Sequence, residues 1–367
     1  MSSDIHLLVA LTPHGYGHAA MTAPVINALR RNLPGLRLTL QTATPRDWLE
    51  SRYDGPFDLI ADTPDFGLKM TSAMAVQAEE SADAYRALHS DFDGVVAAEA
   101  ARMTRLGINL VLANIPYVSL AAARLAGIPA VALSCLNWAD MYDTYCGDRP
   151  EAPAILSQMR LAYEQAAFFL CPAPSIPMPH LSNIRPIGPI ARLGADCRGE
   201  LRQQLGLAED AKVGLIAFGG MSSGLSFADW PGVPGWTWVV TGDGGGHPDL
   251  IDRAAVDMSF TSILRSCDVV VSKPGYGTFA EVAVNGVPLL YLPRPGWPET
   301  PHLAGWLAEH GRCQAIEVAD LFSAEALQGQ LRKLFSNPIK PLVDPSGGEE
   351  GARAILALLA EMGHIQM

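Results

Sequence analysis

Two histidines, His14 and His18, lie in a glycine-rich turn near the start of the chain. The turn TPHGYGH (residues 12–18) follows the apolar run Ile5 to Leu11 and precedes a stretch of helical character, Ala19 to Arg31. A short continuous apolar run is typical of a central strand in a parallel sheet. Ligands bind at the carboxyl ends of such strands, where glycines let the backbone pass close to them. We therefore expect both histidines to face a ligand crevice.

His18 stands at the start of the expected helix, and two roles are open for it. It could bond the backbone of its own helix. It could instead act as a general base, because a helix N-terminus and partial burial both disfavour the imidazolium form. This segment alone does not separate the two roles. His14 fits an exposed turn or substrate-contact residue, and the pair lacks the third ligand that a metal site would need.

A second strand, turn and helix lies between Cys267 and Pro288. Asp268 to Ser272 is apolar and β-branched, Pro274-Gly275-Tyr276-Gly277 interrupts it, and a helix is predicted from Thr278 to Val284. Thr278 and Glu281 have the spacing of a capping box, with Thr278 at the N-cap. A helix that begins directly behind a glycine turn directs its free N–H groups and its positive dipole end at one spot. This arrangement predicts an anion site.

Two more polar turns follow predicted strands. The turn Gly219 to Gly224 comes after the strand Val213 to Phe218, and its N–H groups and hydroxyls could cradle phosphate oxygens. It lacks the lysine of a Walker A loop, which argues against an ATPase. Asn137, Trp138 and Asp140 follow the strand Ala130 to Ser134 at the edge where ligands bind. A structural corner is the competing explanation for these three residues, and it is slightly favoured for Trp138.

Composition and charge restrict the class of protein. The 367 residues suggest two domains, and 49% hydrophobic with 17% charged residues is typical of a soluble globular protein. The formal net charge of -12 argues against broad binding to nucleic acid or to an anionic membrane. Six cysteines without C-x-x-C spacing indicate neither a zinc site nor a disulfide framework, so a reducing cytoplasm is expected. No signal peptide or stable membrane insertion is predicted, which leaves peripheral membrane contact open.

Four segments of the chain carry further structural predictions. A helix with one break near Asp91 to Gly94 is expected over Met70 to Leu106. The stretch Cys171 to Pro189 contains six prolines and is predicted to be an extended linker. A loop is predicted over Pro293 to His302, and a final helix over Glu350 to Met362.

The order of these elements resembles the two-domain glycosyltransferase B fold. Within that fold, the chain resembles the family of the N-acetylglucosaminyltransferase that makes the second lipid intermediate of peptidoglycan. The resemblance rests on four places: Gly15 to His18, Tyr117 to Pro129, Ser272 to Pro288, and Glu299 to His302. The motif HGYGHA (residues 14–19) resembles uncharacterised relatives of this group and the N-terminal part of plant L-arabinokinases more closely still.

The resemblance implies an α/β chain with two Rossmann-like, doubly wound domains that face each other across a cleft. The expected segments are an N-terminal acceptor-side domain (1–172), a proline-rich linker (173–190), a nucleotide-sugar donor domain (191–345), and a C-terminal helical segment (346–367) that could pack back on the N-terminal domain. The resemblance also implies that the protein is an inverting, metal-independent glycosyltransferase with no cofactor. The donor would be a nucleotide-diphosphate sugar, a UDP sugar being favoured, and the acceptor an unknown hydroxyl compound.

The same resemblance assigns roles to individual residues. His18 would be the catalytic base or an anchor for the donor phosphate. Glu281 would bond the ribose hydroxyls, with the capping box as its competing role, and Lys273 is either a phosphate contact or a surface lysine. The implied donor-binding residues are Gly15, Gly17, Gly220, Ser222, Ser223, Gly275, Tyr276, Gly277, Thr278, Glu281, Glu299 and His302. The acceptor-side residues are His14, Tyr16, Asn137 and Asp140.

Two other functions remain open at this point. A nucleotide-sugar 2-epimerase of the same fold would need further acid and base groups around the sugar, and the N-terminal half displays no obvious set. A non-catalytic nucleotide-sugar binding protein is favoured only if His14, His18 and Asp140 all point away from the ligand.

Overall fold

The chain folds into two compact units. The structure is a computed structural model, and it describes residues 5–72, 75–218, 225–242 and 246–365. Unit 1 comprises residues 1–71, 75–190 and 346–367, and unit 2 comprises residues 72–74 and 191–345. The chain therefore leaves unit 1 for unit 2 and returns to unit 1 for its last segment.

Unit 1 is built on a parallel sheet. Within the described residues the sheet has seven strands in the order β3-β2-β1-β6-β7-β8-β9, and every pair is parallel. The strands are β1 (His6–Leu11), β2 (Arg37–Gln41), β3 (Asp58–Ile60), β6 (Leu110–Asn114), β7 (Ala130–Leu133), β8 (Phe168–Pro172) and β9 (Ile184–Ile187). The strand order reverses between β1 and β6, which makes this pair the topological switch point.

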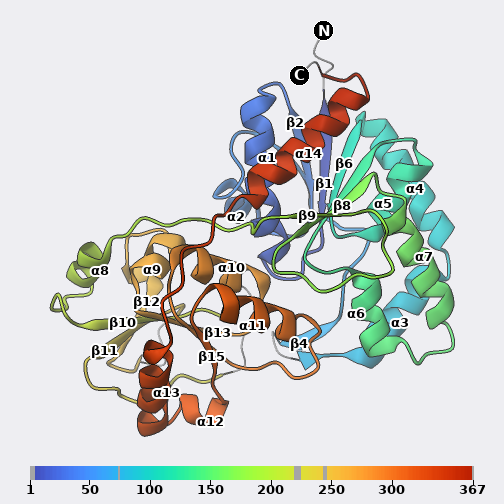
Figure 1. The fold of residues 1–367 in the computed structure, drawn as a ribbon. Coiled ribbons are helices and arrows are strands. Elements are labelled where there is room, and N and C mark those ends of the chain that lie inside the picture. Colours follow the sequence, from blue (N-terminus) through green and yellow to red (C-terminus); the bar gives the residue numbers. More distant parts are fainter. Residues whose placement is uncertain (1–4, 73–74, 219–224, 243–245, 366–367) are drawn as a thin grey trace. The chain divides into compact units, whose positions relative to one another are not determined.

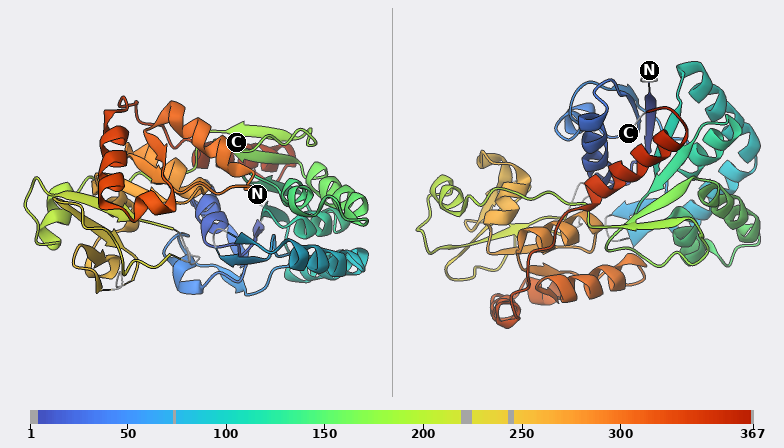
Figure 2. Two further views of the ribbon diagram at one scale, coloured as in Figure 1. Left: turned by 90° about the horizontal axis from the view of Figure 1, so that it is seen from below. Right: turned by 45° about the horizontal axis from the view of Figure 1, so that its top comes forward.

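Helices cover both faces of the unit 1 sheet. They are α1 (Gly17–Asn32), α2 (Arg46–Glu50), α3 (Ala78–His89), α4 (Phe92–Leu106), α5 (Tyr117–Leu125), α6 (Trp138–Cys146), α7 (Ala152–Glu164) and α14 (Gly347–Glu361). Figure 1 shows α1 and α14 on one face and α4, α5 and α7 on the other, as right-handed crossovers on either side of a switch point require. The C-terminal helix α14 lies along α1 (Figure 1, Figure 2), and both belong to unit 1.

Unit 2 repeats this architecture with a second parallel sheet. Among the described residues its order is β12-β11-β10-β13-β14-β15, with a switch point between β10 and β13. The strands are β10 (Lys212–Ile216), β11 (Trp236–Val240), β12 (Leu250–Asp252), β13 (Val269–Ser272), β14 (Leu289–Tyr291) and β15 (Cys313–Ala315). The helices are α8 (Arg198–Gln204), the 3-10 turn η2 (Arg253–Ala255), α9 (Phe260–Ser266), α10 (Tyr276–Asn285), α11 (Glu299–His310), α12 (Val318–Leu321) and α13 (Ala324–Ser336).

The core of unit 2 has two layers, one on each face of the sheet. Val270 packs with apolar residues of α8, α9, α10 and α11 on one face. Its neighbours Val269 and Val271 pack with residues of α12 and α13 on the other. Because side chains alternate along a strand, a strand buried on both faces must be apolar throughout. This explains why the run Val269 to Val271 contains no polar residue.

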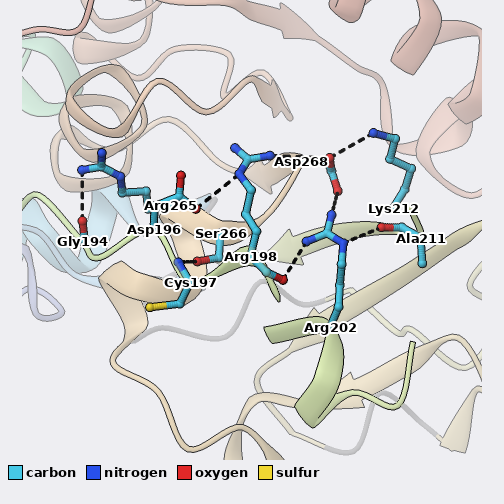
Figure 3. A network of polar contacts seen from close by, with 10 residues as sticks. All are labelled: Gly194, Asp196, Cys197, Arg198, Arg202, Ala211, Lys212, Arg265, Ser266 and Asp268. Atoms are coloured by element: carbon cyan, nitrogen blue, oxygen red, sulfur yellow. Dashed lines mark hydrogen bonds and ion pairs between the residues drawn. The ribbon is translucent and has the colours of Figure 1, made fainter. Parts of the chain in front are cut away.

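A buried carboxylate, Asp268, ties the amino-terminal edge of this sheet to α8 (Figure 3). Its Oδ2 accepts hydrogen bonds from Nη2 of Arg202 at 2.8 Å and from the backbone N of Val213 at 2.9 Å. Its Oδ1 accepts from Nζ of Lys212 at 3.2 Å, and Nη1 of Arg198 lies 3.9 Å away. Asp268 and Arg202 are both buried. The network lies at the amino-terminal ends of the strands, opposite to the loops at their carboxyl ends. We infer that it stabilises the fold.

Most predicted strands and helices are present with end points shifted by a few residues, but the prediction that a helix begins at Met70 is wrong. Residues 70–72 and 75–76 are not helical: they form the short strands β4 (Met70–Ser72) and β5 (Ala75–Val76), and the helices begin at Ala78. The helix break occurs close to Asp91, as expected. Within the predicted linker 173–190, the residues Ile184–Ile187 form the strand β9, which pairs with β8 at the edge of the sheet. An edge strand tolerates proline, since one side of it needs no ladder hydrogen bond.

Across the described residues, no helix is both long enough and apolar enough to span a membrane.

The Asp268 network gives a prediction about stability. Replacing Asp268 with Ala leaves the buried guanidinium of Arg202 without its carboxylate, so we expect a loss of about 3–5 kcal/mol in the free energy of unfolding. The control is Asp196→Ala, which removes the exposed ion pair between Asp196 and Arg198 and should cost about 1 kcal/mol or less. Urea titration of both variants measures the difference, and equal losses would contradict the assignment.

Candidate functional site

The switch point of unit 1 brings two loops together at the carboxyl ends of β1 and β6. Leu11, the last residue of β1, pairs with Asn114, the last residue of β6. The backbone N of Thr12 continues the pairing by donating to the carbonyl of Asn114 at 3.1 Å. The turn that contains His14 and His18 therefore begins directly beside Asn114, which the sequence analysis did not select.

Asn114 holds the ring of His18. Nδ1 of His18 lies 2.8 Å from Oδ1 of Asn114. The amide nitrogen of Asn114 donates to the carbonyl of His18 at 3.2 Å and to Oγ1 of Thr22 at 3.0 Å. These two donor bonds fix the orientation of the amide, so its oxygen must accept a hydrogen bond from Nδ1–H of His18. The neutral ring then carries its lone pair on Nε2, which becomes the basic nitrogen.

The surroundings of His18 favour the neutral ring. Burial lowers the pKa of His18 below its ordinary value, and the hydrogen bond to Asn114 opposes this to a smaller extent. The partner is an uncharged amide, so no carboxylate stabilises the imidazolium form. His18 therefore has the protonation state that a general base requires near neutral pH.

Trp138 forms a wall against both histidines. Its ring centroid lies 5.5 Å from that of His14, in an edge-on arrangement, and 5.7 Å from that of His18. Trp138 is the first residue of α6, behind the carboxyl end of β7, and it is almost completely buried. Its indole Nε1 donates to Oγ1 of Thr12 at 3.0 Å. Trp138 thus makes structural contacts, as the sequence favoured, and it makes them within the histidine site.

A buried carboxyl group, Asp65, lies behind Thr12. Oγ1 of Thr12 lies 3.4 Å from Oδ1 of Asp65. Burial raises the pKa of Asp65 to about 8, although the backbone amides of Tyr117 and Val118 and the hydroxyl of Thr12 oppose the rise. Near neutral pH this side chain is therefore largely an uncharged carboxylic acid. No motif in the sequence marks Asp65 as a functional residue.

The remaining residues of the first turn shape the entry to α1. Gly15 has a positive φ of 72°, a conformation that strongly favours glycine. Tyr16 is exposed and stacks on Trp48 of α2, with ring centroids 4.8 Å apart. Gly17 is the first residue of α1, and no side chain of the described residues caps this helix.

Asn137 and Asp140, predicted on the acceptor side, have structural partners. Asn137 is the N-cap of α6: its Oδ1 accepts from the backbone N of Asp140 at 2.9 Å. Its Nδ2 donates to Oδ2 of Asp140 at 2.7 Å. Oδ1 of Asp140 lies 3.9 Å from Nη2 of Arg160. These contacts agree with the structural corner, and they orient the helix that carries Trp138.

In unit 2 the switch point places the helix α10 directly behind β13. Gly275 is the N-cap of α10, and no side chain of the described residues caps this end. The first bond along the helix runs from the N of Phe279 to the carbonyl of Gly275 at 3.2 Å. The predicted capping box is wrong, because Thr278 lies inside the first turn rather than at the N-cap. The amides of the first turn point out of the helix end, as an anion site requires.

Cationic side chains gather at the same end of α10. A Cβ atom placed on Gly275 would lie 3.6 Å from Nζ of Lys273. The pKa of Lys273 is lowered, first by burial and then by the charge of Arg294, while Glu299 opposes the shift. Arg294 is buried and lies over the ring of Trp297 at 3.5 Å from its centroid. Lys273 is therefore not an ordinary surface lysine.

The three other donor residues chosen from the sequence lie on α10 and α11. Glu281 is partly exposed in the second turn of α10. Glu299 and His302 belong to the first turns of α11 and not to the predicted loop. Glu299 is buried, and its Oε2 accepts from Nε1 of Trp297 at 2.8 Å, whereas His302 is partly exposed. Gly220, Ser222 and Ser223 lie outside the described residues.

No group of three or more His, Cys, Asp and Glu side chains in the described ranges is arranged to hold a metal ion. The polar groups at the two switch points are instead a neutral imidazole in unit 1 and a pair of cations in unit 2.

The sequence and the fold are similar to those of known glycosyltransferases. Residues 244–356 match the glycosyltransferase family 28 C-terminal domain. The chain is 25% identical over 368 residues to the L-arabinokinase of Arabidopsis thaliana, which covers 98% of this chain but only 35% of that protein. It is 23% identical over 283 residues to the uncharacterized glycosyltransferase MK0977 of Methanopyrus kandleri, covering 72% of this chain and 80% of that protein.

Among solved structures, the calicheamicin glycosyltransferase CalG4 aligns with a TM-score of 0.62 at 16% identity, over 99% of this chain and 100% of that chain. This similarity confirms the predicted fold class, an α/β chain with two Rossmann-like units of the glycosyltransferase B type. The match to the family 28 domain supports glycosyl transfer from nucleotide sugars as the general activity. The narrower likeness to the peptidoglycan enzyme remains a resemblance.

The burial of Asp65 gives a prediction about stability and pH. The folded pKa of about 8 lies above the ordinary value, so the unfolded chain releases its proton at lower pH than the folded one. The contribution of Asp65 to stability is complete below about pH 4 and decreases by roughly 1.4 kcal/mol per unit as the pH rises towards 8. Asp65→Asn removes this dependence. Urea unfolding of both proteins between pH 5 and about 8 should give converging or crossing stability curves, and parallel curves would contradict the raised pKa.

Proposed function

We propose that the protein is an inverting glycosyltransferase in which His18 is the general base and unit 2 holds a nucleotide-diphosphate sugar. The observation that carries the proposal is the hydrogen bond from Nδ1 of His18 to Asn114, which leaves Nε2 as the basic nitrogen. A binding protein has no need of a histidine whose tautomer and pKa are both adjusted in this way. The acceptor is a hydroxyl compound, and the favoured donor is a UDP sugar.

The diphosphate of the donor would bind at the N-terminus of α10. The first-turn amides of α10 and the ammonium group of Lys273 supply hydrogen-bond donors and positive charge at one place. Glu281, one turn further along, would accept hydrogen bonds from the two ribose hydroxyls. His302 would contact the sugar, and Glu299 would maintain the loop through its bond to Trp297.

Gly277 supports a ligand at this helix end. Apart from its chain neighbours and the nearby backbone of its own helix, no atom of the described residues lies within 4 Å of the position where its Cβ would be, and its φ is not in the left-handed region. Glycine inside a helix costs about 0.5–1 kcal/mol relative to alanine. Neither local packing nor backbone geometry requires this cost, whereas a phosphate group passing close to the backbone would explain it.

The reaction would be a single displacement. Nε2 of His18 takes the proton of the acceptor hydroxyl while the oxygen of that hydroxyl forms a bond to the anomeric carbon of the sugar. The bond from that carbon to the donor phosphate breaks, and the electron pair leaves on the nucleoside diphosphate. The amides of α10 and Lys273 stabilise the developing negative charge, the type of contribution that usually dominates such catalysis. One displacement inverts the anomeric configuration, and it needs no metal ion.

Binding of uridine, UMP and UDP tests the donor site. Glu281→Ala should weaken the binding of all three compounds about 10- to 100-fold, because each of them contains the ribose. Lys273→Gln should weaken UDP by a similar factor of about 10 but leave uridine unchanged, because only UDP carries the diphosphate. Isothermal titration calorimetry measures these affinities. Glu309→Ala, at an exposed position of α11, is the control, and a wild-type protein that binds none of the three compounds would contradict a uridine donor site.

Turnover tests the base. His18→Gln should lower the kcat for nucleotide release by about 10²- to 10⁴-fold while UDP affinity persists. In the wild type, activity should be lost as the pH falls through the lowered pKa of His18, because the base must be neutral. Asn114→Asp places a carboxylate beside Nδ1, which raises that pKa and shifts the acidic limb to higher pH. Unchanged turnover in His18→Gln would refute the role of His18 as the general base. Recovery of an epimerised sugar nucleotide would show that the protein is an epimerase and not a transferase.

A further inference from the structure

A directed chain of hydrogen bonds leads from the histidine wall into the core of unit 1. Nε1 of Trp138 can only donate, so Oγ1 of Thr12, at 3.0 Å, must accept from it. The hydroxyl proton of Thr12 is then available for Oδ1 of Asp65, at 3.4 Å. The chain therefore has one direction, Trp138 to Thr12 to Asp65, and it ends on the carboxyl group.

The loop of Asp65 also contacts Trp138 directly. Gly67, two residues further on, has a positive φ of 71°, and a Cβ placed on it would lie only 2.6 Å from the indole ring. The loop therefore supports the ring by close packing and, through Thr12, by a hydrogen bond. The indole also meets His14 and His18, at centroid distances of 5.5 and 5.7 Å.

Asp65 is itself held in place. The backbone amides of Tyr117 and Val118, in the first turn of α5, bond its carboxyl group. The carbonyl of Asp65 accepts a hydrogen bond from Oγ1 of Thr63 at 2.9 Å. Asp65 thus connects the start of α5 to the turn after β1, and its side chain is almost completely buried. Burying a carboxyl group is costly, and an apolar residue would fill the same space without that cost.

We infer that Asp65 is a positioning residue for the histidine site, acting through Thr12 and Trp138 to hold the rings of His14 and His18. The inference rests on the proposed function only for its effect on turnover, because the effect on the histidine rings can be measured without a substrate. Neither Asp65 nor Thr12 touches the reacting atoms in this scheme. Their contribution is to keep the wall behind the base at a fixed distance, and small displacements of a base are expensive in rate.

Thr12→Val provides the test, with Thr12→Ser as the conservative variant. Valine has the shape of threonine but no hydroxyl, so it breaks the chain at its centre. We expect the pKa of His18, followed by NMR of the histidine ring protons, to move upward towards its ordinary value as the packing of Trp138 loosens. The kcat should fall by about 10- to 100-fold with little change in UDP affinity. Thr12→Ser should restore both quantities, and His18→Gln assigns the resonance.

Asp65 is tested by a second pair of variants. Asp65→Asn keeps an acceptor oxygen for Thr12, whereas Asp65→Leu removes it, so the first should resemble the wild type in the His18 titration and the second should resemble Thr12→Val. Thr39→Val is the control for general loss of a buried hydroxyl, because Oγ1 of Thr39 bonds Nε2 of His6 at 2.9 Å in the same sheet.

The outcomes separate this inference from the proposed function. If Thr12→Val and Thr39→Val leave the His18 titration equally unchanged, the positioning role is refuted, even if the wild-type protein has the proposed activity. If Thr12→Val shifts the titration and Thr12→Ser restores it, the positioning role stands, even if no glycosyl transfer is found and the proposed function fails.

Discussion

The parallel pairing of β1 with β6 is the constraint on which the histidine site depends. It aligns the ends of two strands that are about a hundred residues apart in the chain, so that Leu11 lies beside Asn114. The turn after β1 can then place His18 against the amide of Asn114, and the same edge receives Trp138 from the start of α6, the helix that follows β7. Because parallel strands all end at one edge, polar residues from separate loops converge there without any local sequence signal.

The two units use the same edge with opposite electrostatics. In unit 1, burial and an uncharged amide partner keep an imidazole neutral. In unit 2, two cations and an open helix end share one location, and burial, followed by the charge of Arg294, lowers the pKa of Lys273. Such a concentration of positive charge is relieved by an anion, whereas the neutral imidazole is suited to accept a proton. This contrast supports the proposed division of roles, in which unit 2 binds a donor diphosphate and unit 1 deprotonates an acceptor hydroxyl.

The sequence could predict features that depend on local patterns. Apolar runs located the central strands, and the glycine turns located both switch-point loops, including His18 and Gly275. The errors have local causes too. Thr278 has the spacing of a cap, but Gly275 ends the extended segment first. Glu299 follows prolines, which suggested a loop, yet α11 starts there. The prolines of the predicted linker 173–190 do not prevent the strand β9, because pairing with β8 at a sheet edge needs only one side of the strand.

By itself, the sequence determined the α/β class and the glycine turns that mark both switch points, because side-chain periodicity and backbone freedom act over a few residues. Only the tertiary structure decided the partners of those turns. Asn114, Thr12, Trp138 and Asp65 come from four separate segments, and no spacing in the chain relates them. Strand order in the sheet brings them within hydrogen-bond distance. The tautomer of His18 and the raised pKa of Asp65 are therefore properties of burial and pairing, which a linear pattern does not contain.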